Sequence, residues 1–307
     1  MPTPSNEYRE QARLVVSALP HVAGEACFAL KGGTAINLFL LDMPRLSVDI
    51  DLEYLGTEER AAALHQIDRA LGRVRRALVA AIPEARTRAG GGGMPGVSDK
   101  FNVEVGPVGV KIEVNHVFRR TVWPPSVRRV APKVEAELGF AEMQVASFED
   151  IYAGKIAAAL DRQHPRDLFD VKLLLDGEGV SDRLFRTFLV YLIAHNRPIA
   201  ELIAPTRKGV RELYENGFIG MSADSPSLES LLEARERLVR DLHSRLTDKT
   251  RRFLLSVKRM APEWDLLEVP GVADLPAVRW KLRNLAAMTP QGHAAAVRTL
   301  TTVLDRI

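Results

Sequence analysis

Apolar and polar residues alternate in three short stretches of the first half of the chain. In residues 47–52 (SVDIDL), one serine and two aspartates alternate with valine, isoleucine and leucine. Two more alternating runs, at 100–105 and 110–115, flank the turn residues 106–109 (GPVG). Because successive side chains of a strand point to opposite faces of its sheet, each run predicts a strand with one apolar and one polar face.

The second half of the chain shows the three- and four-residue spacing of amphipathic helices. Ser147 is followed by a helical pattern that runs to Leu160, and Pro165 opens a second one. Further helical patterns cover 184–194, 228–246 and 278–303, and prolines separate them. We therefore predict an α/β (α+β) protein, with a mixed sheet in an N-terminal domain (1–145) and a mainly helical C-terminal domain (146–307).

The first of these strands carries candidate metal ligands. Asp49 and Asp51 project to the same side, with Cα atoms roughly 6.5 Å apart. Two carboxylates this close repel each other unless a positive charge lies between them. Oxygen ligands favour a hard cation, and we expect Mg²⁺ rather than a transition metal.

A glycine pair precedes these aspartates and predicts an anion site. An apolar run ends at Lys31, Gly32 and Gly33 follow, and Thr34 is expected to cap the next helix. Glycines allow a ligand to approach the backbone closely, and the amides at a helix N-terminus bind phosphate. An ordinary strand-to-helix turn is the simpler alternative, but the carboxylate pair that follows favours a nucleotide site.

Two common phosphate-binding motifs do not fit this turn. A P-loop needs Lys and Ser or Thr after its last glycine, and a dinucleotide fingerprint needs a third glycine. The remaining architecture is the nucleotidyltransferase fold, in which a glycine turn binds the triphosphate and three carboxylates hold the metal. Glu113 is the preferred third carboxylate because its strand is more apolar. Glu104 is the competitor, and either residue could instead be a solvated edge residue.

Three ordered motifs within residues 25–175 resemble the AbiEii/AbiGii (MenT-like) family of nucleotidyltransferase toxins. They are KGGT at 31–34, RLSVDIDL at 45–52 and KIAAALDRQHPRDLFD at 155–170. The resemblance implies an NTP-dependent enzyme. Its implied catalytic residues are Asp49, Asp51, Glu113, Lys155 and Asp170, of which the first three are metal ligands. Its implied nucleotide-binding residues are Gly32, Gly33, Thr34, Ser47, Lys155, Arg162 and Arg166.

The third motif admits two interpretations. Lys155 is expected to bind the phosphates of the nucleotide, and Asp170 either orients Lys155 or assists deprotonation of the acceptor. Arg162 and Arg166 either assist Lys155 or hold Asp167 and Asp170 in ion pairs. The alternative is a purely structural salt-bridge cluster. A phosphoryl group on Thr34 or Ser47 would obstruct the phosphate pocket, but the sequence does not show whether either is modified.

Composition is consistent with an enzyme of a reducing compartment. The 307 residues are 46% hydrophobic and include a single cysteine, which excludes a disulfide framework. Neither a signal-peptide pattern nor an apolar run long enough for a bilayer is found, and the histidines lack zinc-site spacing. We therefore expect a cytoplasmic protein that does not contact membranes.

Net charge is only +3, but basic residues are concentrated near the C-terminus. Residues 235–259 contain nine Lys or Arg against three acids. A solvated helix face is the usual explanation, and RNA phosphate contacts are the functional alternative. The candidate acceptor-binding residues are Arg251, Arg252, Arg279 and Lys281. The partly basic stretch 86–96, expected to be a mobile loop, is a further candidate.

Taken with the resemblance, these features imply a Mg²⁺-dependent nucleotidyltransferase that moves NMP from NTP to an acceptor hydroxyl. The family implies the 3′ end of tRNA as acceptor, a pyrimidine nucleotide, and a role as a toxin paired with a separately encoded antitoxin. Two alternatives stay open: a protein or small-molecule hydroxyl as acceptor, and a non-catalytic binding module on the same scaffold.

Overall fold

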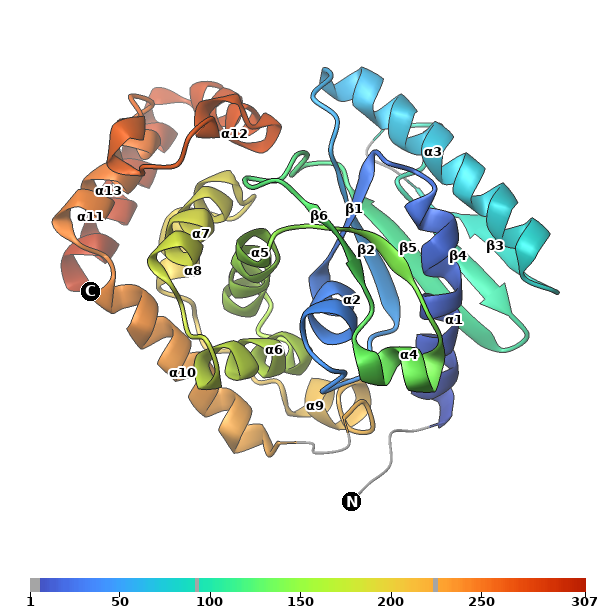
Figure 1. Cartoon of the computed structure of the whole chain (residues 1–307). Helices are drawn as coiled ribbons and strands as arrows, with labels where there is room; N and C mark the ends of the chain where they lie inside the picture. Colours follow the sequence, from blue (N-terminus) through green and yellow to red (C-terminus); the bar gives the residue numbers. More distant parts are fainter. Residues whose placement is uncertain (1–5, 92–93, 223–225) are drawn as a thin grey trace. The chain divides into compact units, whose positions relative to one another are not determined.

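The computed structural model describes residues 6–91, 94–222 and 226–307, and its contacts divide the chain into two compact units (Figure 1). The first unit comprises Met1–Ile151 and Phe218–Ser225, and the second comprises Tyr152–Gly217 and Pro226–Ile307. The division falls inside one helix, α5 (Phe148–Asp161), a few residues after the boundary that the helical pattern suggests.

A late segment of the chain joins the first unit through backbone groups. Leu46 N donates a hydrogen bond to Met221 O at 2.7 Å, and Ser222 Oγ donates one to Pro44 O at 2.8 Å. Nothing in the apolar pattern of this segment distinguishes it from the surrounding helical region. The segment belongs to the first unit because of long-range hydrogen bonds, which cannot be recognised in the sequence.

The first unit is built on a seven-stranded mixed sheet with the order β3-β4-β5-β2-β1-β7-β6. Pairs β1–β7 and β2–β5 are parallel, and the other four pairs are antiparallel. The strands are β1 (Phe28–Lys31), β2 (Asp49–Tyr54), β3 (Arg86–Ala89), β4 (Lys100–Val105), β5 (Val108–Asn115), β6 (Ser126–Arg129) and β7 (Glu142–Val145). The predicted mixed sheet is confirmed.

One stretch expected to be a loop is partly a strand. Residues 86–89 form β3, which pairs antiparallel with β4 from Arg86↔Glu104 to Ala89↔Phe101. The sequence RTRA has no apolar alternation, so the hydrogen bonds to β4, rather than a buried face, define this edge strand. Gly92 and Gly93, within the same predicted loop, lie outside the described residues.

The two faces of the sheet differ in chemistry. Ile50 and Leu52 of β2 and Val110, Ile112 and Val114 of β5 are buried. Helix α1 (Asn6–Ala23) packs on β5 and β7, and α3 (Arg60–Ala81) packs on β3 and β4 (Figure 1). By alternation, the polar residues of β2 and β5 occupy the opposite face. The unit also contains α2 (Gly32–Ala35), the π-helix η1 (Ile36–Leu40) and α4 (Pro132–Leu138).

The second unit is helical, as the three- and four-residue spacing predicts. It contains the rest of α5, α6 (Pro165–Asp176), α7 (Asp182–Ala194), α8 (Ile199–Ile203), α9 (Arg211–Gly217), α10 (Leu228–Ser244), α11 (Asp248–Lys258), the short η2 (Trp264–Leu266) and η3 (Val272–Asp274), α12 (Pro276–Ala286) and α13 (Pro290–Arg306). Helix α6 packs against α10, α7 against α12, and α11 against α13. In the described part of the chain, no helix has the length and apolar character that a bilayer crossing requires.

Candidate active site

A row of four charged residues crosses the centre of the sheet in the first unit. The register pairs Lys31 of β1 with Asp51 of β2, Asp51 with Glu113 of β5, and Glu113 with Lys100 of β4. Residues in register on neighbouring strands point to the same face, so these side chains lie on the polar face of the sheet. The row places two carboxylates side by side between two lysines.

The sheet order distinguishes the two candidates for the third carboxylate. Glu113 lies on β5, directly beside β2, and is in register with Asp51. Glu104 lies on β4, one strand further away, and pairs with Gly109 near the hairpin turn and with Arg86. The geometry therefore brings Glu113 and the two aspartates together and leaves Glu104 away from them.

Lys111 is a charged member of this face that the sequence analysis did not select. Its Nζ lies 2.6 Å from Glu113 Oε2, and its backbone is in register with Asp49. Burial alone would lower the pKa of Lys111, but Glu113, Asp49 and Asp51 together raise it. Burial would likewise raise the pKa of Glu113, but Lys111, Lys100 and His116 lower it. Lys111 lies two residues before Glu113 on the same strand, so strand alternation could have placed both side chains on the same face.

The two glycines are required by close approaches of charged side chains. Gly32 has φ +71°, a conformation that residues with a Cβ rarely adopt. A Cβ on Gly32 would stand 2.5 Å from Asp51 Oδ2, and one on Gly33 would stand 2.6 Å from an Arg45 guanidinium nitrogen. The carboxylate of Asp51 therefore lies against the turn, and the buried Arg45 lies behind it. Arg45 is a second residue that the analysis of single positions missed.

Thr34 does not have its predicted role as a helix cap. Lys31 is the N-cap of α2, with no side-chain cap bond, and Thr34 lies within the helix. The Thr34 hydroxyl donates to the Asp49 carbonyl oxygen at 2.5 Å and lies 2.8 Å from Ser47 Oγ. Both hydroxyls are buried. Thr34 and Ser47 thus hold the start of β2 next to the turn, because the Thr34 hydroxyl contacts both Ser47 and the backbone of Asp49.

Lys31 is held by a carboxylate on the next strand. Its Nζ lies 2.7 Å from Oε2 of Glu53, whose side chain is 1% exposed. Burial raises the pKa of Glu53 to about 8, against the opposite effect of Lys31. Glu53 follows Asp49 and Asp51 on the same face of β2, so this face continues from half-exposed carboxylates to a buried one. Lys31 is the third charged residue that the sequence analysis did not assign to the site.

In the second unit, Lys155 lies in a buried cluster with two aspartates. Its Nζ is 3.0 Å from Asp167 Oδ1 and 2.9 Å from Asp170 Oδ2. The more exposed Arg162 contacts Asp167 through Nε at 2.5 Å. Burial would raise the pKa of Asp167, but Lys155 and Arg162 hold it well below its usual value. These contacts are those expected if Asp170 orients Lys155 and Arg162 pairs with Asp167, and they are equally those of a purely structural salt-bridge cluster.

Arg166 contributes a local contact to this cluster. Its backbone N–H donates to Nδ1 of His164, the N-cap of α6, at 3.1 Å. The bond satisfies one of the free amides at the start of the helix that carries Asp167 and Asp170. The N-cap therefore stabilises the helical turn on which both aspartates depend.

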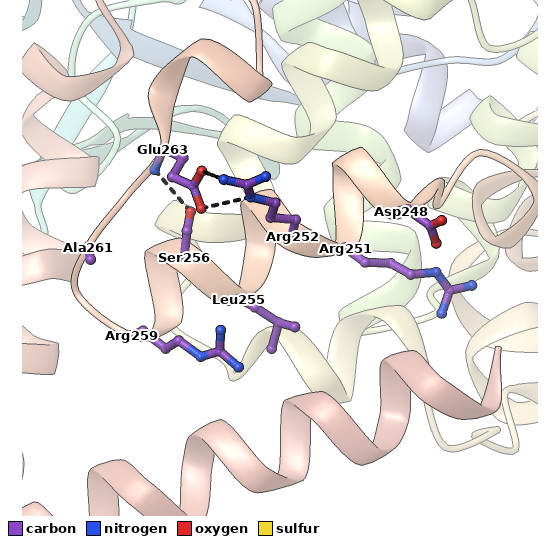
Figure 2. Close-up of a pocket in the computed structure, with 8 residues that line it drawn as sticks. All are labelled: Asp248, Arg251, Arg252, Leu255, Ser256, Arg259, Ala261 and Glu263. Carbon is purple, nitrogen blue, oxygen red and sulfur yellow. Dashed lines mark hydrogen bonds and ion pairs between the residues drawn. The ribbon is translucent and has the colours of Figure 1, made fainter.

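The four candidate acceptor-binding residues are engaged to different degrees. Arg252 bonds Glu263, with Nε 3.1 Å from Oε1, whereas Figure 2 shows the guanidinium groups of Arg251 and Arg259 extending away from that pair. Arg279 pairs with Asp274 at 2.7 Å. Lys281 Nζ donates to His195 O at 2.6 Å, at the C-terminal end of α7. Arg251 is half-buried, and its Nε donates to Leu246 O at 2.8 Å, which is a backbone carbonyl rather than a carboxylate.

The donor set of the first unit matches a hard cation in its chemistry. Among the residues that the structure describes, no three His, Cys, Asp or Glu side chains form a ready-made cation site. Asp49, Asp51 and Glu113 all act on the Lys111 ammonium, and Lys100 Nζ lies 3.9 Å from Glu113 Oε1. Carboxylate oxygens are the ligands that Mg²⁺ prefers, and the attraction of this face for an ammonium supports a cation there.

Comparison with known proteins relates this chain to one family. Residues 13–284 match the model of the family described as "Nucleotidyl transferase AbiEii toxin, Type IV TA system". The fold is similar to that of MenT4, nucleotidyltransferase toxin Rv2826c from Mycobacterium tuberculosis H37Rv. The TM-score is 0.59 and the identity 14%, over 91% of this chain and 93% of that chain.

A putative nucleotidyltransferase from H. pylori matches less well. Its TM-score is 0.45 and its identity 16%, over 79% of this chain and 97% of that one. A comparison with curated protein sequences gives no match. The family match covers both units, and the MenT4 likeness concerns the fold alone.

Proposed function

Because the chain belongs to the AbiEii family of nucleotidyl transferase toxins, we propose that it transfers NMP from an NTP to the 3′ hydroxyl of tRNA. The observation that carries the proposal is the row Lys31, Asp51, Glu113 and Lys100 beside the Gly32 turn. It supplies phosphate-binding cations and metal-binding carboxylates on one face of one sheet. The proposed setting is the cytoplasm, and the proposed partner is a separately encoded antitoxin.

In the proposed reaction, the acceptor oxygen attacks the α-phosphorus of the NTP. A new P–O bond forms, the bond to the β-phosphate oxygen breaks, and pyrophosphate leaves. Gly32, Gly33 and Thr34 would present backbone amides to the β- and γ-phosphates, and Lys31 would neutralise their charge. Lys155, Arg162 and Arg166 would be the phosphate-binding residues of the second unit, and Asp170 would orient the Lys155 ammonium.

Asp49, Asp51 and Glu113 would hold Mg²⁺ in this scheme. When bound, the metal would screen the triphosphate and lower the pKa of the acceptor hydroxyl. Asp49 and Asp51 are half-exposed, and Glu113 would give up its Lys111 contact to hold the cation. Arg251 and Arg252 of the pocket in Figure 2 are the proposed acceptor contacts in the second unit.

The proposal is tested by incubating the protein with each α-³²P-labelled NTP, Mg²⁺ and either total tRNA or total cellular protein. We expect label in tRNA, with a pyrimidine nucleotide preferred, and sequencing should locate the addition at the 3′ end. Label in protein or in a small molecule would instead support the alternative acceptors. Absence of label in every fraction, with NTP still bound, would identify a non-catalytic module.

A further inference from the structure

The first unit contains a basic cavity that none of the proposed steps uses. It has a volume of about 420 Å³ and lies between α3, the residues before β4 and the start of β4. Its charged lining residues are Asp68, Arg69, Arg73, Arg75, Arg76 and Lys100. Five cations and one carboxylate therefore line one hollow of a chain whose total net charge is only +3.

The arginines gather because of their spacing on α3. Arg69, Arg73 and Arg76 follow a four- and three-residue interval, which places them on one face of the helix. All three are exposed. The opposite face of α3 is apolar and buried, with Ile67, Ala70, Leu71, Val74 and Leu78 among its residues. The amphipathic helix thus turns its arginine face to solvent next to the edge of the sheet.

Only some of these charges are neutralised within the protein. Arg73 binds both carboxylate oxygens of Glu25 at 2.7 Å, and Arg75 Nε donates to the Thr87 hydroxyl at 3.3 Å. Asp68 accepts a hydrogen bond from the Ser98 backbone at 3.0 Å. In the described part of the chain, neither Arg69 nor Arg76 has an acidic partner. The cavity therefore retains an excess of positive charge.

Lys100 connects this cavity to the candidate active site. It lines the cavity and also lies in the charged row, with its Nζ 3.9 Å from Glu113 Oε1. Two strand spacings, about 10 Å across the sheet, separate the backbones of Lys100 on β4 and Asp51 on β2. Helix α3 covers the face opposite to the charged row, so an RNA that contacts both must pass the start of β4 at Lys100. Both features belong to the first unit, so the arrangement is internal to one compact body.

We propose that this cavity binds the phosphate backbone of the acceptor RNA close to its reacting end. The inference rests on the proposed function. Arg69 and Arg76 are seven residues apart, about 10 Å along the helix, which is longer than one phosphate group. A chain of phosphates can pair with both arginines at once, and the arginine guanidinium is well suited to phosphate oxygens.

The pocket in the second unit has a weaker positive field. Asp248 and Glu263 line it together with Arg251, Arg252 and Arg259, and Glu263 occupies Arg252 (Figure 2). Its excess of cations over acids is one, whereas the cavity beside α3 has an excess of four. The cavity beside α3 is therefore the main electrostatic contact for RNA.

The test compares a double variant, Arg69→Gln with Arg76→Gln, with a matched control, Arg13→Gln with Arg128→Gln. The control removes two exposed arginines from the same unit, at α1 and β6. Binding of total tRNA is measured without NTP at several salt concentrations, together with binding of inorganic tripolyphosphate. Thermal melting verifies that both variants fold.

We expect the double variant to bind tRNA about tenfold more weakly at 0.1 M salt, and the slope of log K against log[salt] to fall by between about one and two. The control should match the wild type, and Arg69→Lys with Arg76→Lys should retain most of the affinity. Equal tRNA affinity in variant and control overturns the proposal. Loss of tripolyphosphate binding to the same extent would identify a nucleotide-phosphate site instead.

A separate measurement, nucleotide transfer by the wild-type protein, tests the proposed function. The labelled-NTP assay with wild-type protein reports transfer, whereas this test reports binding alone. Wild-type protein that binds tRNA through Arg69 and Arg76 but labels only protein would remove the tRNA acceptor and leave an RNA-binding cavity in place.

Discussion

The two carboxylate clusters of this protein differ in how their charges are satisfied. On the sheet, Asp49, Asp51 and Glu113 are half-exposed and lie near lysine side chains that water also reaches. In the helical unit, Lys155, Asp167 and Asp170 have side chains that are 6%, 2% and 0% exposed. The first cluster is reached by solvent, whereas the ion pairs among Lys155, Asp167 and Asp170 are buried in the folded unit.

This difference has energetic consequences. Like charges on a half-solvated face cost little stability, because water screens them, and they attract a cation from solution. A buried ammonium with two carboxylates has lost its hydration, so removing one member leaves uncompensated charge in a medium of low dielectric constant. Substitutions in the two clusters should therefore separate activity from stability.

The largest effect is expected for Asp51→Asn. This nearly isosteric change removes one negative charge from the sheet face and one oxygen ligand, and nucleotide transfer should fall by about 10³-fold. The free energy of unfolding should stay within about 0.5 kcal/mol of the wild type, because repulsion with Asp49 and Glu113 is relieved. Labelled-NTP transfer and urea denaturation measure the two quantities.

An Asp51→Asn protein that transfers nucleotide at the wild-type rate would contradict the active-site assignment. Glu104→Gln is the matched control, because it removes a carboxylate from the same sheet on β4, two strands away from β2. Its transfer rate should equal that of the wild type. Equal losses in both variants would show that net charge, rather than position in the row, determines the rate.

The next effect concerns Lys155→Met in the buried cluster. Loss of the ammonium leaves Asp167 and Asp170 without their main partner, which should lower the free energy of unfolding by about 3–5 kcal/mol. The folded pKa of Asp167 is lowered from 3.8, so its contribution is complete above that value and is lost as the pH falls below it. The stability gap between wild type and variant should therefore narrow between about pH 5 and pH 3.

Lys155→Arg is the control for charge in the same cluster. It keeps the cation but changes its shape, so it should recover part of the lost stability. A Lys155→Met protein with the free energy of unfolding of the wild type would show that the buried ion pairs of this cluster do not stabilise the fold. The contrast between the two clusters would then be wrong.

The sequence predicts the parts of the first unit that are governed by local alternation. Strand β2 and the hairpin of β4 and β5 follow from period-two patterns, and the same patterns put Glu113 on the polar face. Pairing between distant strands is not local, which is why Lys31 and Lys100 were missed, whereas Lys111 shares a strand with Glu113 and was within reach of the same alternation pattern. Arg45 was missed for a similar reason, since its contact with Gly33 depends on how the loop returns to the turn.

The smallest effect is expected for Lys281→Met. This variant tests whether Lys281 contacts RNA, as predicted, or stabilises the fold through its hydrogen bond. Lys281 donates to His195 O at 2.6 Å, so its loss should cost about 1 kcal/mol at pH 7, partly offset by relief of its desolvation. Burial and the nearby Lys258 lower its folded pKa from 10.5 to about 8. Between these pH values the unfolded chain binds the extra proton, so the wild type should gain stability over the variant as the pH rises from 8 to 10.5.

Affinity for tRNA distinguishes the two roles of Lys281. If the Lys281 ammonium stays bound to His195 O, Lys281→Met should leave the tRNA affinity and its salt dependence unchanged. Arg251→Gln, in the pocket of Figure 2, should reduce both the affinity and its salt dependence. A loss of tRNA affinity in Lys281→Met with no change in the pH dependence of unfolding would reverse this assignment. Lys281 would then be a phosphate contact, and α12, which carries it, would belong to the RNA-binding surface of the second unit.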